Sequence, residues 1–432
     1  MFKTSSRPVN KLPPEILSRV LENRSAERDL VAATHVCRYW RCSLISNPTL
    51  WTCLRFLYDT DRTSTYLERS KSVPIDIHIN LRFKESGVIF ELVAPHAKRT
   101  RSLTIRGTVG PIRALFSHVF CIPATSLQHL KIEVFLGDDY EKTNASCLPD
   151  NFLHQHAPTL RSVSFTSLLP TFESHPPFSN LTRFILFLPW FGDEFRVSAL
   201  FRVLSSSHRL REVFIHVFTT LIEDTPNSVV SLELLEELEY HGDLGPRVLA
   251  WMRLPRLRML NVVSVVGTLA NLLPVEGDLL LSKATRMLWR QAPRGIDLRG
   301  SEITIQVSSH CGSTDLADWF SGIPPTSFGQ IRDLTYSGFP NPGPPNTAEL
   351  LIVAFENLEV LQFSRCAAWL IEAISRTLFP QDGKEIPCPS LREIRCDSRE
   401  ALESLTWFVE GRKRVGYWLQ LVYSSDAETL HE

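Results

Sequence analysis

One spaced phrase of apolar residues returns along most of the chain and restricts what the chain can fold into. In each copy an apolar residue is followed, three and five positions later, by two further apolar residues. The nine full copies are Leu127/Leu130/Ile132, Leu160/Val163/Phe165, Leu181/Phe184/Leu186, Leu210/Val213/Ile215, Leu235/Leu238/Tyr240, Leu257/Leu260/Val262, Ile331/Leu334/Tyr336, Leu358/Leu361/Phe363 and Leu391/Ile394/Cys396. Two partial copies are Leu103/Ile105 and Ile303/Ile305. Such self-similarity predicts stacked structural repeats.

The second half of the phrase alternates apolar and variable residues, which predicts a short strand with one buried face. The first apolar residue is expected to pack beneath the preceding turn, as in a leucine-rich repeat. The step from Leu127 to Leu160 is 33 residues and the step from Leu160 to Leu181 is 21. Regular repeats run about 20 to 29 residues, so the longer steps predict inserted helices or loops. Helical patterns for an outer wall occur at 197–204, 348–355 and 369–378.

The predicted fold class is therefore α/β, an irregular leucine-rich-repeat solenoid with a parallel sheet on its inner face. The array is expected to be irregular because only Cys366 fills the position where regular repeats place an Asn or Cys that bonds the turn backbone. The last stretch, 400–422, predicts a helix and a strand that cap the final repeat. The basic run Arg412-Lys413-Arg414 is interpreted as a solvated loop or helix end.

Charge and hydropathy exclude several partners. The chain has 46 Lys and Arg residues against 47 Asp and Glu residues, so no overall field attracts a polyanion, and we expect no nucleic acid. The longest apolar run, 184–191, contains Pro189 and is far shorter than the roughly 20 residues of a spanning helix, so we expect no membrane association. The first residues show no secretory pattern, and the nine cysteines include no CxxC pair. We therefore expect free thiols in a reducing compartment, the cytoplasm or the nucleus.

The segment 12–51 is more strongly patterned than its surroundings and predicts three helices. Pro13 and Pro14 suit a helix start, where a missing N–H has no partner to lose. Asp29 is the expected N-cap of a second helix, and a third is expected to end near Asn47-Pro48. A unit this small has too much surface to bury its own large apolar residues, so part of that surface should need a partner.

This segment resembles an F-box. The family pattern is a Leu-Pro pair, an acidic residue and two aliphatics, a helix with a Leu, Cys-Arg-x-Trp, and a loop closing on Leu-Trp. The matching residues here are Leu12, Pro13, Glu15, Ile16, Leu17, Leu30, Cys37, Arg38, Trp40, Leu50 and Trp51. One departure is Glu22-Asn23-Arg24, where the family usually has another Leu or Phe.

The resemblance implies docking onto the Skp adaptor of a Skp-cullin-F-box ubiquitin ligase. The implied adaptor-binding residues are Leu12, Pro13, Ile16, Leu17, Leu30, Val36, Cys37, Trp40, Leu50 and Trp51. Among these, Trp40 and Trp51 are expected to be partly internal. The whole chain resembles the F-box proteins with leucine-rich repeats that abound in mushroom-forming fungi. The expected domains are an F-box-like domain at 8–55, a connecting segment at 56–95 and the solenoid at 96–432.

The sequence lacks the motifs that catalysis commonly requires. Neither Gly-rich phosphate loop, GxGxxG or GxxxxGK[ST], occurs, and the GxSxG nucleophile elbow is missing. His154 and His156 would share a face only on a strand, whereas their segment is interpreted as a helix. We therefore expect no catalytic residue, no cofactor and no metal site.

The predicted function is that of a non-enzymatic substrate receptor that binds the adaptor and cullin complex at one end and an unidentified protein target through the repeats. One alternative is a repeat scaffold with no role in ubiquitin transfer, and a third is a hydrolase hidden in the solenoid. Positions expected to line a recognition surface are Gln128, His129, Arg211, Glu212, Glu359 and Gln362.

Overall fold

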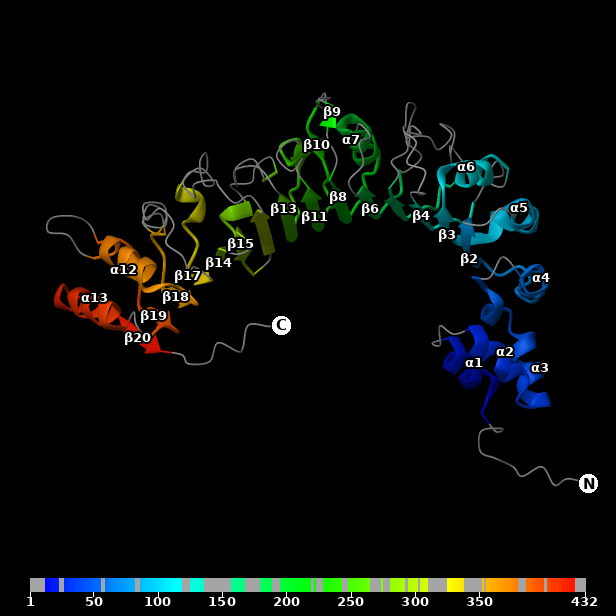
Figure 1. Ribbon diagram of the computed structural model, residues 1–432, viewed down its shortest axis with the longest axis horizontal. Helices are drawn as coiled ribbons and strands as arrows, with labels where there is room; N and C mark the ends of the chain where they lie inside the picture. Colours follow the sequence, from blue (N-terminus) through cyan, green and yellow to red (C-terminus); the bar gives the residue numbers. More distant parts are fainter. Residues whose placement is uncertain are drawn as a thin grey trace, which may run out of the picture. The chain divides into compact units, whose positions relative to one another are not determined.

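The computed structural model describes residues 12–22, 27–55, 59–81, 86–118, 125–135, 157–167, 179–188, 195–218, 221–222, 228–242, 248–264, 273–274, 280–291, 294–301, 304–309, 325–337, 352, 355–379, 386–399 and 402–423. The chain divides into two compact units, Met1–Leu188 and Pro189–Glu432. Figure 1 shows the order of their helices and strands along the chain. Among the helices in the described ranges, none is long and apolar enough to cross a membrane.

The first unit begins with short helices. They are α1 (Pro14–Glu22), α2 (Glu27–Thr34), α3 (Arg38–Ser46) and the 3-10 helix η2 (Pro48–Trp51). Helix α1 begins at Pro14, as predicted, and α3 is capped by Cys37, whose sulfur accepts a hydrogen bond from the Trp40 N–H. Helix α2 begins two residues before Asp29, so the predicted N-cap is wrong and Asp29 lies inside the first turn.

The sheet of the first unit is parallel throughout its described strands. These are β1 (Cys53–Leu54), β2 (Ile75–Leu81), β3 (Thr100–Gly107), β4 (His129–Val134), β5 (Ser162–Thr166) and β6 (Arg183–Leu188), paired in that order. The helices between them are α4 (Thr60–Arg69), α5 (Ser86–Val93), η3 (Ala94–Arg99) and α6 (Val109–His118). In Figure 1 α5 and α6 lie together on one side of β2 and β3.

The sheet starts earlier than predicted. The range 56–95, interpreted as a connecting segment, contains β2, which pairs with both β1 and β3. Residues Ile75, Ile77, Ile79 and Leu81 of β2 are all buried, so this strand has the same buried face as the repeats. Strand β2 does not match the repeat phrase, because its alternating apolar residues have no apolar residue three positions before them.

The second unit continues the same strand-and-helix pattern. Its main sheet consists of β8 (Glu212–Val217), β11 (Glu237–Gly242), β13 (Met259–Ser264), β16 (Thr304–Ser309), β15 (Arg294–Arg299), β14 (Arg286–Gln291), β17 (Asp333–Ser337), β18 (Val360–Ser364), β19 (Glu393–Cys396) and β20 (Gln420–Tyr423), in that spatial order. Two small pairs join β7 (Phe195–Arg196) to β9 (Leu221–Ile222) and β10 (Val230–Ser231) to β12 (Met252–Arg253). The helices are α7 (Val197–Ser206), η5 (Pro325–Phe328), α12 (Ala368–Thr377) and α13 (Leu402–Arg414).

One strand breaks the predicted parallel arrangement. Strand β15 runs antiparallel to both β14 and β16, whereas β14 is parallel to β17 and β13 is parallel to β16. Only two residues separate the end of β14 at Gln291 from the start of β15 at Arg294. A connection this short joins antiparallel strands, since a parallel crossover needs roughly a dozen residues or more. The parallel sheet therefore holds one reversed strand.

The residues of the repeat phrase belong to the core. All 27 apolar residues of the nine full copies are buried, at 3% exposure or less. In the partial copies, Leu103 and Ile105 are buried, Ile305 lies in β16, and Ile303 lies outside the described residues. Because the strands pair in register, residues at equal positions of successive copies stack, as the rings of Tyr336 and Phe363 do at a centroid distance of 5.8 Å. The fold class predicted from the phrase is confirmed.

The predicted outer helices are confirmed wherever the structure describes them. The patterns at 197–204 and 369–378 correspond to α7 and α12, and the terminal stretch forms α13 and β20. The pattern at 348–355 lies almost entirely outside the described residues. Cys366 acts as predicted, because its thiol donates to the backbone carbonyls of Tyr336 and Ser364, each at 3.4 Å.

Candidate functional sites

The N-terminal helices pack around a small core of their own. Leu17 of α1, Ala33 of α2 and Leu44 of α3 are buried together, and Leu21 and Trp40 pack against them. Backbone and side-chain hydrogen bonds tie the helices further. Asn47 Nδ2 donates to Ser18 Oγ at 2.9 Å, and the Tyr39 hydroxyl donates to the Leu12 carbonyl oxygen at 2.8 Å.

Four apolar side chains of this helical segment remain exposed to solvent. Their exposed fractions are 44% for Ile16, 48% for Val20, 55% for Val36 and 40% for Tyr39. Ile16 and Val20 are four residues apart on α1 and therefore lie on the same face of the helix. The buried Leu17 is rotated by about 100° from Ile16 around the helix axis. The helical segment therefore leaves part of its apolar surface unburied, as the sequence predicts.

The residues implied as adaptor-binding fall into three groups. Pro13, Ile16 and Val36 are exposed, whereas Leu12, Cys37, Trp40 and Leu50 are partly buried. Leu17, Leu30 and Trp51 are buried, at 1%, 8% and 0% exposure. The sequence resemblance did not separate exposed residues from buried ones, because it rests on residue type and spacing alone. Val20 and Tyr39 are exposed apolar residues that the motif omits.

Trp51 joins the helical segment to the sheet. Its indole N–H donates to the Leu44 carbonyl oxygen at 2.9 Å, and its ring meets the Tyr66 ring edge-on at a centroid distance of 4.8 Å. The Arg69 guanidinium lies 4.4 Å from the centre of the same ring. Two residues later the chain enters β1, which pairs with β2. The helical segment therefore packs directly against the start of the sheet in the first unit.

The solvent-facing side of the sheet carries paired charges of both signs. Arg101 contacts Asp76 at 2.6 Å, and Glu133 of β4 pairs with both Lys131 and Arg106. Partial burial acts to raise the pKa of the Glu133 carboxyl, but hydrogen bonds from Lys131 and Arg106 outweigh burial and lower that pKa below its ordinary value. This face is polar but locally neutralised.

The predicted recognition positions lie at or beside this face, and several already have partners. Arg211 pairs with Glu236 at 3.2 Å, and Glu359 pairs with Arg392 at 2.6 Å. His129 is exposed, and the remaining positions, Gln128, Glu212 and Gln362, are partly buried.

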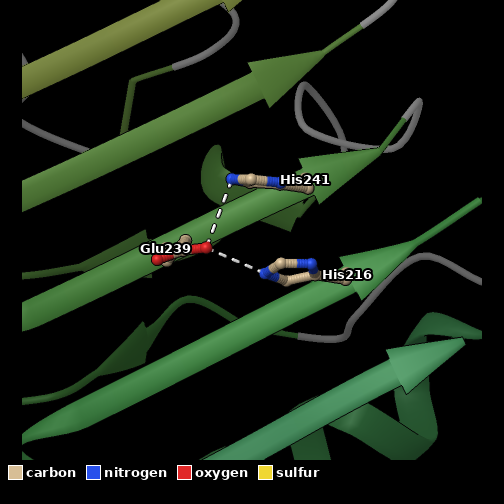
Figure 2. A group of neighbouring side chains, drawn as sticks. All are labelled: His216, Glu239 and His241. Atoms are coloured by element: carbon tan, nitrogen blue, oxygen red, sulfur yellow. Dashed lines mark hydrogen bonds and ion pairs between the residues drawn. The ribbon is translucent and has the colours of Figure 1, made fainter. Parts of the chain in front are cut away.

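A group of metal-ligand type lies on the same face of the second unit and was missed at the sequence level. His216 on β8 and Glu239 and His241 on β11 converge as Figure 2 shows, with one nitrogen or oxygen from each within 4.8 Å of the others. The signal was present in the sequence, since His216 and His241 directly follow the last apolar residue of two successive copies of the phrase. In-register pairing of β8 and β11 makes them neighbours.

The basic run of the last helix is only partly as the sequence predicts. The basic run at 412–414 ends α13, as predicted, but Arg412 is fully buried and not solvated. Its guanidinium donates to the carbonyl oxygens of Pro387 and Cys388 at 3.0 and 2.9 Å. The pair His154 and His156 lies outside the described residues.

Comparison with known proteins supports the reading of the N-terminus. A family model described as F-box-like matches residues 9–57. No curated protein matches the chain. Among solved structures the chain is similar to "Crystal structure of TLR13-ssRNA13 complex", with 11% sequence identity and a TM-score of 0.31. That match covers 77% of this chain and 44% of the other, so the chain spans less than half of the length of that protein. The chain therefore has an F-box-like segment, and a largely parallel sheet of leucine-rich-repeat type follows it.

Proposed function

We propose that this chain is the target-recognition subunit of a Skp-cullin-F-box ubiquitin ligase, acting in the cytoplasm or the nucleus. In this proposal the N-terminal helices bind the Skp adaptor and the solvent-facing side of the sheet binds a target protein. The chain performs no chemistry itself. It raises the local concentration of target lysines near a thioester that another subunit carries.

The observation that carries the proposal is the exposed apolar surface within the F-box-like segment. Ile16, Val20 and Val36 are each about half exposed although the segment has a well-formed core beneath them. Burying apolar surface releases about 25 cal/mol per Å², so these side chains favour association with an apolar partner surface. Tyr39 is also exposed, and its hydroxyl donates a hydrogen bond to the Leu12 carbonyl oxygen, which restrains its ring.

The target-binding half of the proposal rests on the sheet. Its solvent-facing positions carry Arg, Lys, Asp, Glu and His side chains in short-range pairs, a surface that suits a polar protein partner and has no large field of one sign. We place target contacts at the predicted positions, which are Gln128, His129, Arg211, Glu212, Glu359 and Gln362. Replacing Arg211 or Glu359 also breaks an existing ion pair, so the test of these two positions should include the charge-swapped partner.

The decisive experiment measures adaptor binding by the full chain. Ile16→Asp and Val36→Asp place a charge on the exposed apolar surface without disturbing the core, and each is expected to weaken binding of a purified Skp adaptor by at least about tenfold. Val88→Asp is the matched control, because Val88 is 49% exposed on α5, outside the F-box-like segment. Equal binding by the parent and both variants would contradict the proposal.

The same measurement distinguishes the proposal from the scaffold alternative. If the parent chain is folded and shows no binding to any Skp adaptor, a repeat scaffold without ubiquitin transfer becomes the better description. Point variants are preferable to removing residues 1–55, because such a deletion also removes Trp51 and β1, which pack against α4 and β2.

A further inference from the structure

The His216, Glu239 and His241 group is built by the sheet itself. His216 and His241 occupy directly paired positions on the parallel strands β8 and β11. Glu239 is two residues before His241, so its side chain projects from the same, solvent-facing side of the strand. The residues between and before them, Tyr240 and Ile215, are fully buried and anchor both strands to the core.

The side chains meet at one carboxylate oxygen. Glu239 Oε1 lies 2.9 Å from His216 Nε2 and 3.3 Å from His241 Nε2, the two contacts drawn in Figure 2. The imidazole rings stack with centroids 4.2 Å apart and an interplanar angle of 19°. Each side chain is about one quarter exposed, at 25%, 23% and 25%, and the His241 Nε2 atom at the meeting point is itself buried.

The backbone beside the group is held in a conformation that only glycine allows. Gly242 follows His241 with φ of +143°, and a Cβ at this position would collide with the Val217 carbonyl oxygen of β8. The two strands therefore approach closely at the histidine pair. A close, rigid backbone beside the ligands reduces the entropy lost when the side chains are fixed by a bound ion.

The geometry matches the requirements of a tetrahedral metal ion. Metal–nitrogen and metal–oxygen bonds of about 2.0 to 2.2 Å place neighbouring ligand atoms roughly 3.3 Å apart in a tetrahedral site. The two separations from Glu239 Oε1, 2.9 and 3.3 Å, are close to that value, and all three ligand atoms lie within 4.8 Å of one another. The stacked imidazole rings must rotate for both nitrogens to direct their lone pairs at one ion. Two imidazoles with one carboxylate favour Zn²⁺ and neighbouring transition metals over Mg²⁺ and Ca²⁺, which prefer sets of oxygen ligands.

We propose that His216, Glu239 and His241 form a Zn²⁺ site on the solvent-facing side of the sheet. The three side chains supply three ligands, through Nε2 of each histidine and a carboxylate oxygen of Glu239. The fourth ligand is a water molecule or an atom from a bound protein. The site does not depend on adaptor binding, so its test is independent of the test of the proposed function.

Calorimetric titration of the metal-free full chain with ZnCl₂ tests the site, with MgCl₂ as the comparison salt. We expect one Zn²⁺ equivalent to be lost, or bound at least about tenfold more weakly, in His216→Ala, Glu239→Gln and His241→Ala. Mg²⁺ should give no comparable binding. His208→Ala is the matched control, because His208 is an exposed histidine just before β8 and is expected to leave the titration unchanged.

Two results would overturn the proposal. The first is a parent chain that binds no Zn²⁺ equivalent, and the second is a set of three variants that bind Zn²⁺ with the parent stoichiometry and affinity. Circular dichroism of each variant checks folding, and Glu239→Gln, which preserves side-chain size, keeps the test valid if an alanine variant unfolds. The absorption spectrum of bound Co²⁺ gives a second readout, since tetrahedral coordination with histidine ligands is expected only in the parent and the His208→Ala control.

Discussion

The two ends of the repeat sheet are closed by helical elements that bury different side chains. At the N-terminal end Trp51 is fully buried beside Tyr66 and Arg69, next to the first strand β1. At the C-terminal end α13 fully buries both Phe408 and Arg412, and the Arg412 guanidinium donates to two backbone carbonyls ahead of the last strand β20. Both ends therefore bury an aromatic ring, and the C-terminal end also buries a charged group that is held by hydrogen bonds.

This difference indicates how each end relates to a partner. Trp51 covers the edge of the sheet but does not cover the helices that precede it, in which Ile16 and Val20 remain exposed. At the other end, Arg412 donates to the carbonyl oxygens of Pro387 and Cys388, and the Phe379 ring stacks on Trp407 at a centroid distance of 4.3 Å. This difference fits the proposal that another molecule covers the N-terminal helices, whereas α13 packs against β20 at the end of its own sheet.

The largest expected effect concerns Trp51. Trp51→Ala removes a fully buried ring together with its hydrogen bond to Leu44, and we expect a loss of about 3 to 5 kcal/mol in the free energy of unfolding. Trp418→Ala is the control at the other end, because this ring is 78% exposed and its loss should cost less than about 1 kcal/mol. Urea unfolding of both variants measures the difference. Equal losses would show that Trp51 does not close the N-terminal end.

The next effect concerns Arg412. Burial lowers the pKa of its guanidinium, which records the cost of holding the charge in the core. Arg412→Met removes two charged hydrogen bonds but also relieves that cost, so we expect a net loss of about 2 to 3 kcal/mol. Lys413→Met, at an exposed position in the same helix, should change the stability by no more than about 0.5 kcal/mol. If Arg412→Met is as stable as the parent, the buried charge is not what closes this end.

The free energy of unfolding should also depend on pH through a group at the C-terminal end. Burial raises the pKa of the Cys388 thiol to about 12, although the nearby Arg412 acts in the opposite direction. Below the ordinary thiol pKa both the folded and unfolded chains keep this proton. As the pH rises above it, only the unfolded chain loses the proton, so stability falls, by up to about 1.4 kcal/mol per pH unit.

Urea titrations at pH 8, 9 and 10 measure this slope. Cys388→Ala should reduce it, whereas Cys42→Ala, at an exposed position on α3, should leave it unchanged. An unaltered slope in Cys388→Ala would assign the alkaline instability to other groups.

The smallest effect on stability is expected at the exposed residues of α1. Ile16→Ser and Val20→Ser should change the free energy of unfolding by no more than about 0.5 kcal/mol, because these side chains are already about half exposed to water. Leu17→Ser, at the adjacent buried position, should be destabilising by several times that amount, since it places a hydroxyl among Ala33 and Leu44. A large loss in Ile16→Ser would mean that this surface is covered by the chain itself.

The repeat phrase predicted the strands well because its information is local. A strand with one buried face needs only correctly spaced apolar residues, and Leu235, Leu238 and Tyr240 are buried for that reason alone. The reversal of β15 was not predictable in the same way, because it depends on the length of one connection and on which neighbour the strand pairs with. The F-box resemblance likewise located the helices without showing that Leu17 lies inside and Ile16 outside.

By itself the sequence determined the kind of structure: repeated strands with one apolar face, outer helices at 197–204 and 369–378, and a helical N-terminus with more apolar residues than it can bury. The tertiary structure alone decided which side chains meet. His216 and His241 are 25 residues apart in the sequence and become neighbours only because β8 and β11 pair in register. From the sequence, Arg412 is expected to be solvated like Lys413 and Arg414. Only the fold brings the carbonyls of Pro387 and Cys388 beside it. Burial and convergence depend on distant segments of chain, and no local pattern specifies them.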